Sequence, residues 1–118
     1  MDAGNAVPGT LAGSAHQSHA YVDGACLYFS LRGDVDVGRR AQWYRQAWDA
    51  ANAVLIKYNA ALSHHHGVGL LRAPYMQESL GSAFQVLQAI KRTLDPQNIL
   101  NPGKLGLGDQ LFPDRSGR

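Results

Sequence analysis

The part of this 118-residue chain that is richest in chemically versatile groups is the run His64, His65 and His66, which Gly67 and Gly69 follow. A neutral imidazole can donate a hydrogen bond to an oxygen, accept a proton or bind a metal. The two glycines remove side chains, so the backbone can approach a flat ring or a substrate closely. In an extended segment, His64 and His66 would share one face and His65 would point to the other. We interpret the run as a native functional site; a solvated polar turn is the alternative.

The second candidate for chemistry is Tyr28, which lies in a run of strand-forming residues at 25–31, ACLYFSL. Because side chains alternate across a strand, Tyr28 and Cys26 are expected on one face. The opposite face is expected to be the core face, with Leu27, Phe29 and Leu31. A phenol ordinarily has a pKa of about 10, so its use as a base near neutral pH requires nearby positive charge or hydrogen bonds. Histidines that converge on Tyr28 would provide them, and a half-buried structural tyrosine is the alternative.

The second half of the chain holds four further polar candidates. Arg72 follows the histidine run and is a candidate clamp for an anion. The segment 98–105, NILNPGKL, predicts a tight turn whose Asn98, Asn101 and Lys104 are candidates for contact with a cofactor. The alternatives are a solvated arginine and an ordinary Pro-Gly turn.

A first helix that positions these groups is expected over residues 37–59, which contain no proline and one glycine. Its apolar side chains recur at three- and four-residue steps, which is typical of an amphipathic helix. These side chains are Trp43, Ala47, Ala50, Ala51, Val54 and Tyr58. The polar face is expected to carry Arg39, Arg45, Asp49 and Asn52.

A second helix is expected over residues 75–94, where apolar side chains again have helical spacing. Pro74 suits its first turn. Asp95 ends it, because a residue that precedes a proline is disfavoured in a helix. Gly81 would lie in the helix interior at a cost of about 1 kcal/mol relative to alanine, which predicts a close packing contact there.

The composition is that of a folded protein, with 45% hydrophobic and 17% charged residues. A net charge of +2 is too small to argue for nucleic acid, and Cys26 is the only cysteine, so no internal disulfide forms. No stretch reaches the length of a membrane span, and the first residues lack the pattern of a signal peptide, which favours a cytoplasmic location. Residues 1–15 are expected to be flexible, with a strand beginning near Thr10, and residues 108–118 to form a polar tail.

Three segments within residues 14–107 together resemble the C-terminal region of FAD-linked oxidases of the vanillyl-alcohol oxidase superfamily. They are SHAYVDGACLYFSL at 18–31, LSHHHGVGLLR at 62–72 and LQAIKRTLDPQNILNPGKL at 87–105. Within the superfamily, the ACLYF strand and the SHHHGVG run are most similar to the alkyldihydroxyacetonephosphate synthase (alkylglycerone-phosphate synthase) family. The resemblance implies an α+β fold over residues 16–107. This would be part of a ferredoxin-like cap domain, with a strand–helix unit, a C-terminal helix and an extended tail.

The resemblance also implies an activity. The acyl group of acyl-dihydroxyacetone phosphate would be exchanged for a long-chain alcohol, which makes the ether bond of ether lipids, and the FAD would do no net redox work. Tyr28 would have an acid/base role, and His64, His65 and His66 would act beside the flavin. The implied substrate contacts are His19 and Arg72, and the implied cofactor contacts are Gly67, Gly69, Asn101 and Lys104.

The sequence departs from a second group of the superfamily, the 2-hydroxyacid dehydrogenases that oxidise D-lactate or glycolate. Those enzymes carry Glu-His-Gly where this chain has His65, His66 and Gly67, and a GDGNxH segment where it has VDGACLY. They use the missing His and Glu to hold a divalent metal, so no metal site is expected here. An FAD-dependent 2-hydroxyacid dehydrogenase is therefore the alternative within the enzymes.

The superfamily binds FAD chiefly through an N-terminal domain that is much larger than this chain, and the sequence contains no GxGxxG cradle for a dinucleotide. We therefore expect the C-terminal piece of a larger enzyme, completed by an FAD-binding domain or a companion chain. The expected substrate is a small molecule or a lipid precursor. A homodimer and a peripheral membrane surface complete the expected partners. An α+β module that binds a partner without catalysis is the alternative from a different class.

Overall fold

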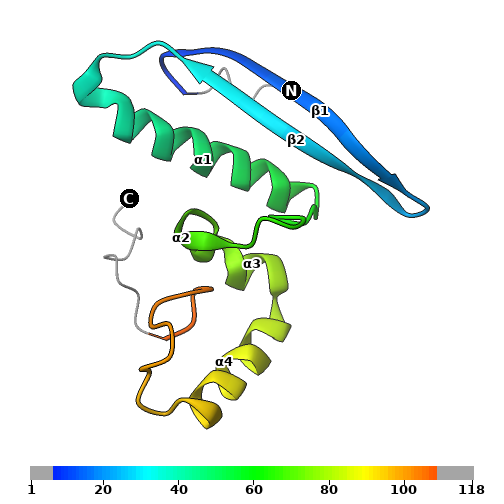
Figure 1. The fold of residues 1–118 in the computed structure, drawn as a ribbon, viewed down its shortest axis with the longest axis vertical. Coiled ribbons are helices and arrows are strands. Elements are labelled where there is room, and N and C mark those ends of the chain that lie inside the picture. The colour runs from blue at the N-terminus through cyan, green and yellow to red at the C-terminus, as the bar shows by residue number, and fades with distance from the viewer. Residues whose placement is uncertain (1–6, 109–118) are drawn as a thin grey trace. The chain divides into compact units, whose positions relative to one another are not determined.

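The structure is a computed structural model that describes residues 7–108 (Figure 1). The predicted flexibility of residues 1–6 and the predicted tail beyond residue 108 lie outside the described part. The chain divides into two units, Met1–Tyr58 and Asn59–Arg118, and each is described by itself. The first unit holds a β-hairpin and one long helix, and the second holds a series of shorter helices and a C-terminal turn.

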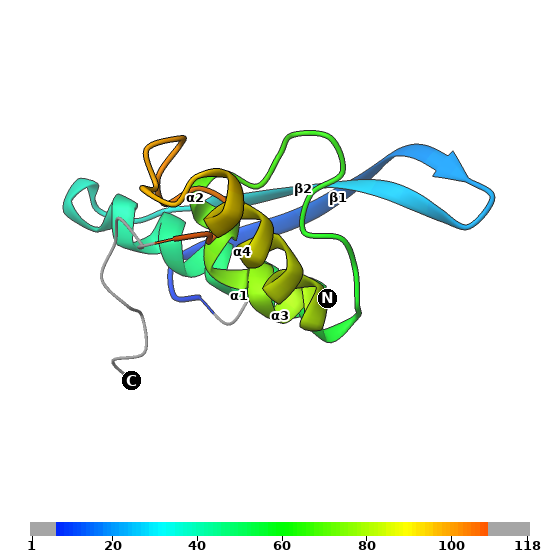
Figure 2. The same ribbon diagram turned by 90° about the horizontal axis from the view of Figure 1, so that it is seen from below.

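The hairpin consists of β1 (Thr10–Tyr21) and β2 (Gly24–Gly33), which pair antiparallel along their whole length (Figures 1 and 2). The strand predicted at 25–31 and the strand start near Thr10 are both confirmed. Residues 10–15, which were expected to be flexible, therefore form the first half of β1. Their backbone groups pair with the last residues of β2. This pairing cannot be read from residues 10–15 alone.

The strand β1 has two bulges, so it contains 12 residues whereas β2 contains 10. The register shifts between Thr10 and Ala12 and again between Gln17 and His19. Each shift leaves one β1 residue, Leu11 or Ser18, without a partner opposite it. The second bulge decides which way the side chains before and after Ser18 point.

The prediction of the core face of β2 is wrong. Leu27 and Phe29, which were expected in the core, are 46% and 51% exposed, whereas Cys26 on the other face is 8% exposed. The two-residue period correctly separates the faces, but it does not say which face is covered. The partners of Leu27, Phe29 and Leu31 are Gln17, Ala15 and Gly13, and two of these are too small to cover them.

The helix predicted at 37–59 is confirmed as α1 (Arg40–Lys57), preceded by the short 3-10 helix η1 (Val37–Arg39). The indole of Trp43 donates a hydrogen bond to the Thr10 hydroxyl at 3.1 Å. A Cβ placed on Gly33 would lie 2.4 Å from the Trp43 ring, so this glycine allows the indole to approach the strand. The contact attaches the start of α1 to the open end of the hairpin.

The assignment of Asn52 to the polar face of α1 is wrong, because its side chain is fully buried. Its amide oxygen and nitrogen have no hydrogen-bond partner among the described residues. The other buried residue of α1, Ala47, lies five positions earlier. The two are about 140° apart around the helix axis at 3.6 residues per turn. The covered side of α1 is therefore broader than the single stripe that spacing predicts.

The second unit contains α2 (Gly69–Arg72), the 3-10 turn η2 (Ala73–Tyr75), α3 (Met76–Leu80) and α4 (Ser82–Leu94). Pro74 lies in the first turn of η2, and α4 ends at Leu94, directly before Asp95, as expected. The single helix predicted at 75–94 is wrong. Gly81 has φ 54° and ψ −131°, which breaks the helix between α3 and α4. A Cβ placed on Gly81 would meet nothing within 4 Å, so the expected packing contact is also wrong.

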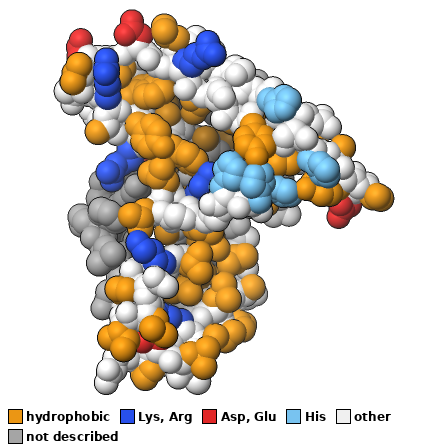
Figure 3. All heavy atoms as spheres, in the orientation of Figure 1, with side chains coloured by type: hydrophobic (Ala, Val, Ile, Leu, Met, Phe, Trp, Pro, Cys, Tyr) orange, Lys and Arg blue, Asp and Glu red, His pale blue; other side chains and the backbone are white. Residues whose placement is uncertain are grey.

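Apolar side chains lie at the surface over α3 and α4 (Figure 3). Phe84 is buried, but Ile90 and Leu94 on the same helix are 49% and 74% exposed. No helix in the described part of the chain is both long enough and apolar enough to cross a membrane. The secondary structure, a two-stranded antiparallel sheet with helices, confirms the predicted α+β class.

Candidate functional site

Tyr28 lies near the middle of β2, on the same sheet face as Cys26, and its side chain is 37% exposed. Its partner across the hairpin is His16 on β1. Directly opposed side chains of an antiparallel pair share a face, with Cβ atoms about 4.5–5.5 Å apart. The phenol predicted to do acid/base chemistry therefore has an imidazole as its cross-strand neighbour.

His19, the predicted substrate contact, lies on the same face as Tyr28. Its partner on β2 is Cys26, two residues from Tyr28. Residues three apart on a regular strand point to opposite faces, but the bulge at Ser18 brings His16 and His19 to one face. The His19 ring also packs against the Tyr21 ring, with centroids 4.7 Å apart.

His16 is the residue of this face that sequence reasoning missed. Its position opposite Tyr28 depends on the pairing register, and the register depends on a bulge that no turn residue announces. The two-residue connection at 22–23 pairs Tyr21 with Gly24, but counting back from it without the bulge would set Gln17, and not His16, opposite Tyr28.

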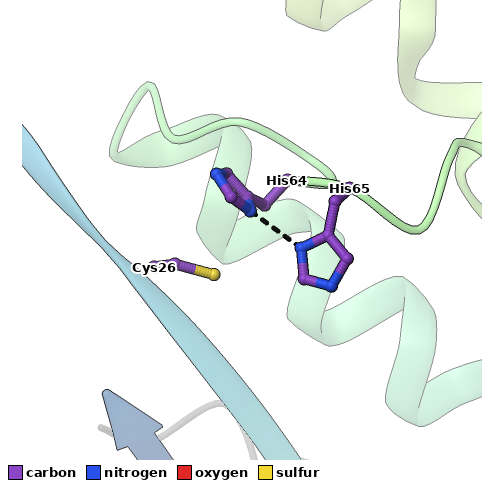
Figure 4. A group of neighbouring side chains, drawn as sticks. All are labelled: Cys26, His64 and His65. Atoms are coloured by element: carbon purple, nitrogen blue, oxygen red, sulfur yellow. Dashed lines mark hydrogen bonds between the residues drawn. The ribbon is translucent and has the colours of Figure 1, made fainter. Parts of the chain in front are cut away.

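His64, His65 and His66 lie in the loop between α1 and α2, and all three are exposed. The Nδ1 atoms of His64 and His65 face one another at 2.8 Å (Figure 4). One ring must donate and the other accept, which couples the tautomers of the two imidazoles. The rings of His65 and His66 are perpendicular, with centroids 4.2 Å apart. The alternation expected of an extended segment does not apply, because the loop bends at each of these residues and neighbouring rings touch.

The backbone after the run has the open geometry expected from its glycines. Gly67 and Gly69 have φ of 74° and 59°, a region that side chains disfavour, and a Cβ at either would meet nothing within 4 Å. Arg72, at the end of α2, directs its Nη1 towards the Gly67 carbonyl at 3.4 Å. The predicted anion clamp thus reaches back to the loop that carries the histidines.

The segment 98–105 is a turn, as predicted. Asn101 and Gly103 both have positive φ, and the Lys104 amide donates to the Asn101 carbonyl at 3.3 Å. The side chains of Asn101 and Lys104 are exposed. No contact in the described part tests their assignment to a cofactor, so it stays a prediction.

Asp95 holds the start of this turn through its carboxylate. From the sequence, it was predicted only to end the preceding helix. Its carboxylate accepts the amide of Ile99 at 3.0 Å and the amide of Leu100 at 2.9 Å. It also forms an ion pair with Lys91, whose ammonium donates to the Leu100 carbonyl at 2.6 Å. The hydrogen bond from Lys91, with the two backbone donors, lowers the pKa of the Asp95 carboxyl below its usual value. An Asp followed by Pro at a helix end was the available signal.

Tyr28 and the histidine run belong to different units of the chain. The structure therefore brings together His16, His19 and Tyr28 within the first unit, and the three-histidine loop with Arg72 within the second. The prediction that the run meets the phenol around a flavin stays a prediction.

The comparisons with known proteins agree on one family. Residues 8–105 match the family described as "FAD linked oxidases, C-terminal domain". Alkyldihydroxyacetonephosphate synthase from Dictyostelium discoideum is 37% identical over 92 residues, and that from Trypanosoma brucei brucei is 35% identical over 91 residues. These matches cover 77% and 76% of this chain and 15% of each synthase.

A relative with another name is also similar. D-2-hydroxyglutarate dehydrogenase from Pseudomonas putida is 32% identical over a gapped alignment of 123 positions, which covers 90% of this chain and 12% of that enzyme. No solved structure matches the chain significantly. The chain spans about 15% of the length of the synthases that it matches. Because the family match at residues 8–105 spans most of the chain, the chain belongs to the family of FAD linked oxidases, C-terminal domain.

Proposed function

We propose that this chain forms the substrate side of the flavin site in an alkyldihydroxyacetonephosphate synthase-like enzyme, where an acyl group on dihydroxyacetone phosphate is exchanged for a long-chain alcohol. Tyr28 is the acid/base residue in this proposal. The similarity to two proteins named alkyldihydroxyacetonephosphate synthase supports the reaction class. The observation that carries the residue assignment is the register of the hairpin, in which Tyr28 shares one sheet face with His16 and His19.

The chemistry of this face suits proton transfer. A phenol close to imidazoles can exchange a proton through hydrogen bonds, and imidazole N–H groups stabilise the negative charge that develops on its oxygen. Tyr28 is 37% exposed, so the described residues do not fully enclose its side chain. The neighbouring Cys26 is buried and supplies no competing accessible nucleophile.

The residues present fit one wall of a flavin site. Gly67 and Gly69 leave open space beside the backbone, where a side chain would otherwise stand, and this suits the approach of a flat ring. His64, His65 and His66 precede these glycines and would face the ring and the substrate. When bound, FAD would supply the reactive ring against which the substrate is held. In this proposal an FAD-binding domain or a companion chain contributes most of the cofactor contacts.

The experiment that tests this proposal is the Tyr28→Phe substitution in the intact gene product. The flavin absorbance spectrum should be retained, while alkyl transfer to acyl-dihydroxyacetone phosphate should fall by about a hundredfold or more, since general acid/base groups contribute about 10²–10⁴-fold. Tyr44→Phe is the matched control, because it removes the same hydroxyl from an exposed position on α1. Full turnover by Tyr28→Phe would refute the role, and a colourless intact gene product would refute the flavin site.

A second candidate function is an FAD-dependent 2-hydroxyacid dehydrogenase. It is favoured by the Pseudomonas putida relative, whose match extends over 90% of this chain. Product analysis separates the two candidates. Dye reduction with D-2-hydroxyglutarate or D-lactate, without alkyl transfer, would favour the dehydrogenase and contradict the synthase-like reaction.

A further inference from the structure

The hairpin face that carries Tyr28 also carries two histidines. Two imidazoles, those of His16 and His19, stand on it side by side. Their partners on β2 are Tyr28 and Cys26, which are two residues apart, so the imidazole-bearing positions are about 7 Å apart along the strand. Both histidine side chains are exposed. This spacing lets two ring N–H groups reach one small ligand from neighbouring positions.

We propose that His16 and His19 form an anion-binding pair that holds the charged group of the substrate next to Tyr28. The proposal rests on the proposed function, in which Tyr28 faces the substrate. An imidazole always carries at least one N–H donor, whatever its tautomer, and two such donors bind the oxygens of a phosphate or a carboxylate. His16 is directly opposite Tyr28, with Cβ atoms about 4.5–5.5 Å apart in such a pair, so an anion on His16 would be next to the phenol-bearing position.

The bulge at Ser18 is the structural device behind this pair. The sequence spacing of three residues would put His16 and His19 on opposite faces of a regular strand. Ser18 has no partner on β2, and His19 returns to the face of His16 because of this extra residue. The opposite face carries no imidazole, and Gln17 is the one side-chain N–H donor among its paired β1 residues Gly13, Ala15, Gln17 and Ala20.

Phosphate ester and carboxylate substrates share the anionic chemistry, so the test uses both. Binding of inorganic phosphate and of D-lactate to the intact gene product is measured by NMR titration without turnover. His16→Ala should weaken binding of the preferred anion by about tenfold to a hundredfold, as expected for the loss of one hydrogen bond to a charged group. His19→Ala should have a similar effect, and His16→Gln, which keeps an N–H donor, should lose less.

Gln17→Ala is the matched control, because Gln17 is the next residue on the same strand and faces the other way. It should bind either anion like the wild type. Preference for phosphate over lactate would assign a phosphate ester substrate, and the reverse a carboxylate. Equal anion affinity of the wild type, His16→Ala and His19→Ala, all shown to be folded by circular dichroism, would overturn the proposal. Since this titration needs no catalysis, it is separate from the Tyr28→Phe assay, which tests the proposed function.

Discussion

Gly81 gives the sharpest test of the fold, because the sequence and the structure predict opposite changes in the free energy of unfolding for Gly81→Ala. In the interior of a continuous helix at 75–94, Gly81→Ala would stabilise the protein by about 1 kcal/mol. In the structure, Gly81 has φ 54° and ψ −131° between α3 and α4. A residue with a side chain disfavours this conformation by about 1–3 kcal/mol.

The size of the effect comes from the backbone alone. A Cβ at Gly81 would meet nothing within 4 Å, so no steric clash adds to the cost and no new contact offsets it. The Gly81 amide donates to the Gln77 carbonyl at 2.9 Å, and the Gly81 carbonyl accepts the Phe84 amide at 3.1 Å. These bonds fix the glycine where the two helices meet, so the strain cannot relax without losing them. We expect the free energy of unfolding to fall by about 2 kcal/mol.

The assay is urea unfolding of the purified chain followed by far-UV circular dichroism. With a slope of about 1–2 kcal/mol per molar urea, the midpoint should fall by about 1–2 M. Gly38→Ala is the matched control, since a Cβ at Gly38 also meets nothing within 4 Å and its φ is not positive. The control should leave the midpoint unchanged or raise it slightly. A higher midpoint for Gly81→Ala than for the wild type would mean that α3 and α4 form one continuous helix and that Gly81 does not break it.

Two further substitutions test the contacts that hold each unit. Asp95→Asn should reduce the free energy of unfolding at neutral pH. The Lys91 ammonium lowers the folded-state pKa of the Asp95 carboxyl, so the ionised carboxylate stabilises the wild type. This stabilisation is complete at pH values above the unfolded-state pKa of about 3.9 and is lost as the pH falls through the lower folded-state pKa. Urea unfolding between about pH 7 and pH 2 should therefore show the variant and the wild type converging in acid, and a constant difference would contradict the assignment. Trp43→Phe should cost about 1–3 kcal/mol, because it removes the bond to the Thr10 hydroxyl and part of the ring packed on Gly33; an unchanged urea midpoint by circular dichroism would contradict that contact.

Local patterns predicted the elements well, because each depends on residues that are close in the sequence. The expected helix at 37–59 differs from α1 by a few residues at each end, and the expected strand at 25–31 lies within β2. The stop at Asp95 followed from the conformational restriction that a proline places on the residue before it. Gly81 was the local exception, since a glycine is compatible with a helix interior as well as with a break.

Features that depend on a partner segment could not be predicted. The burial of Asn52, the exposure of Leu27 and Phe29, and the approach of Trp43 to Gly33 all depend on which surfaces become covered. Dependence on a partner segment also explains why the candidate site was predicted only in part. Tyr28 was identified by its residue type and strand context, whereas its neighbour His16 was missed, because the register of β1 cannot be read from either strand alone.

The most direct test of the proposed site is an experimental structure of the flavin-loaded intact gene product with a substrate analogue bound. We expect the Tyr28 hydroxyl to lie within about 2.6–3.2 Å of the reacting group of the analogue, directly or through one water. We also expect the imidazoles of His64, His65 and His66 to line the same flavin ring. A Tyr28 hydroxyl separated from the flavin by packed protein would overturn the proposed acid/base role.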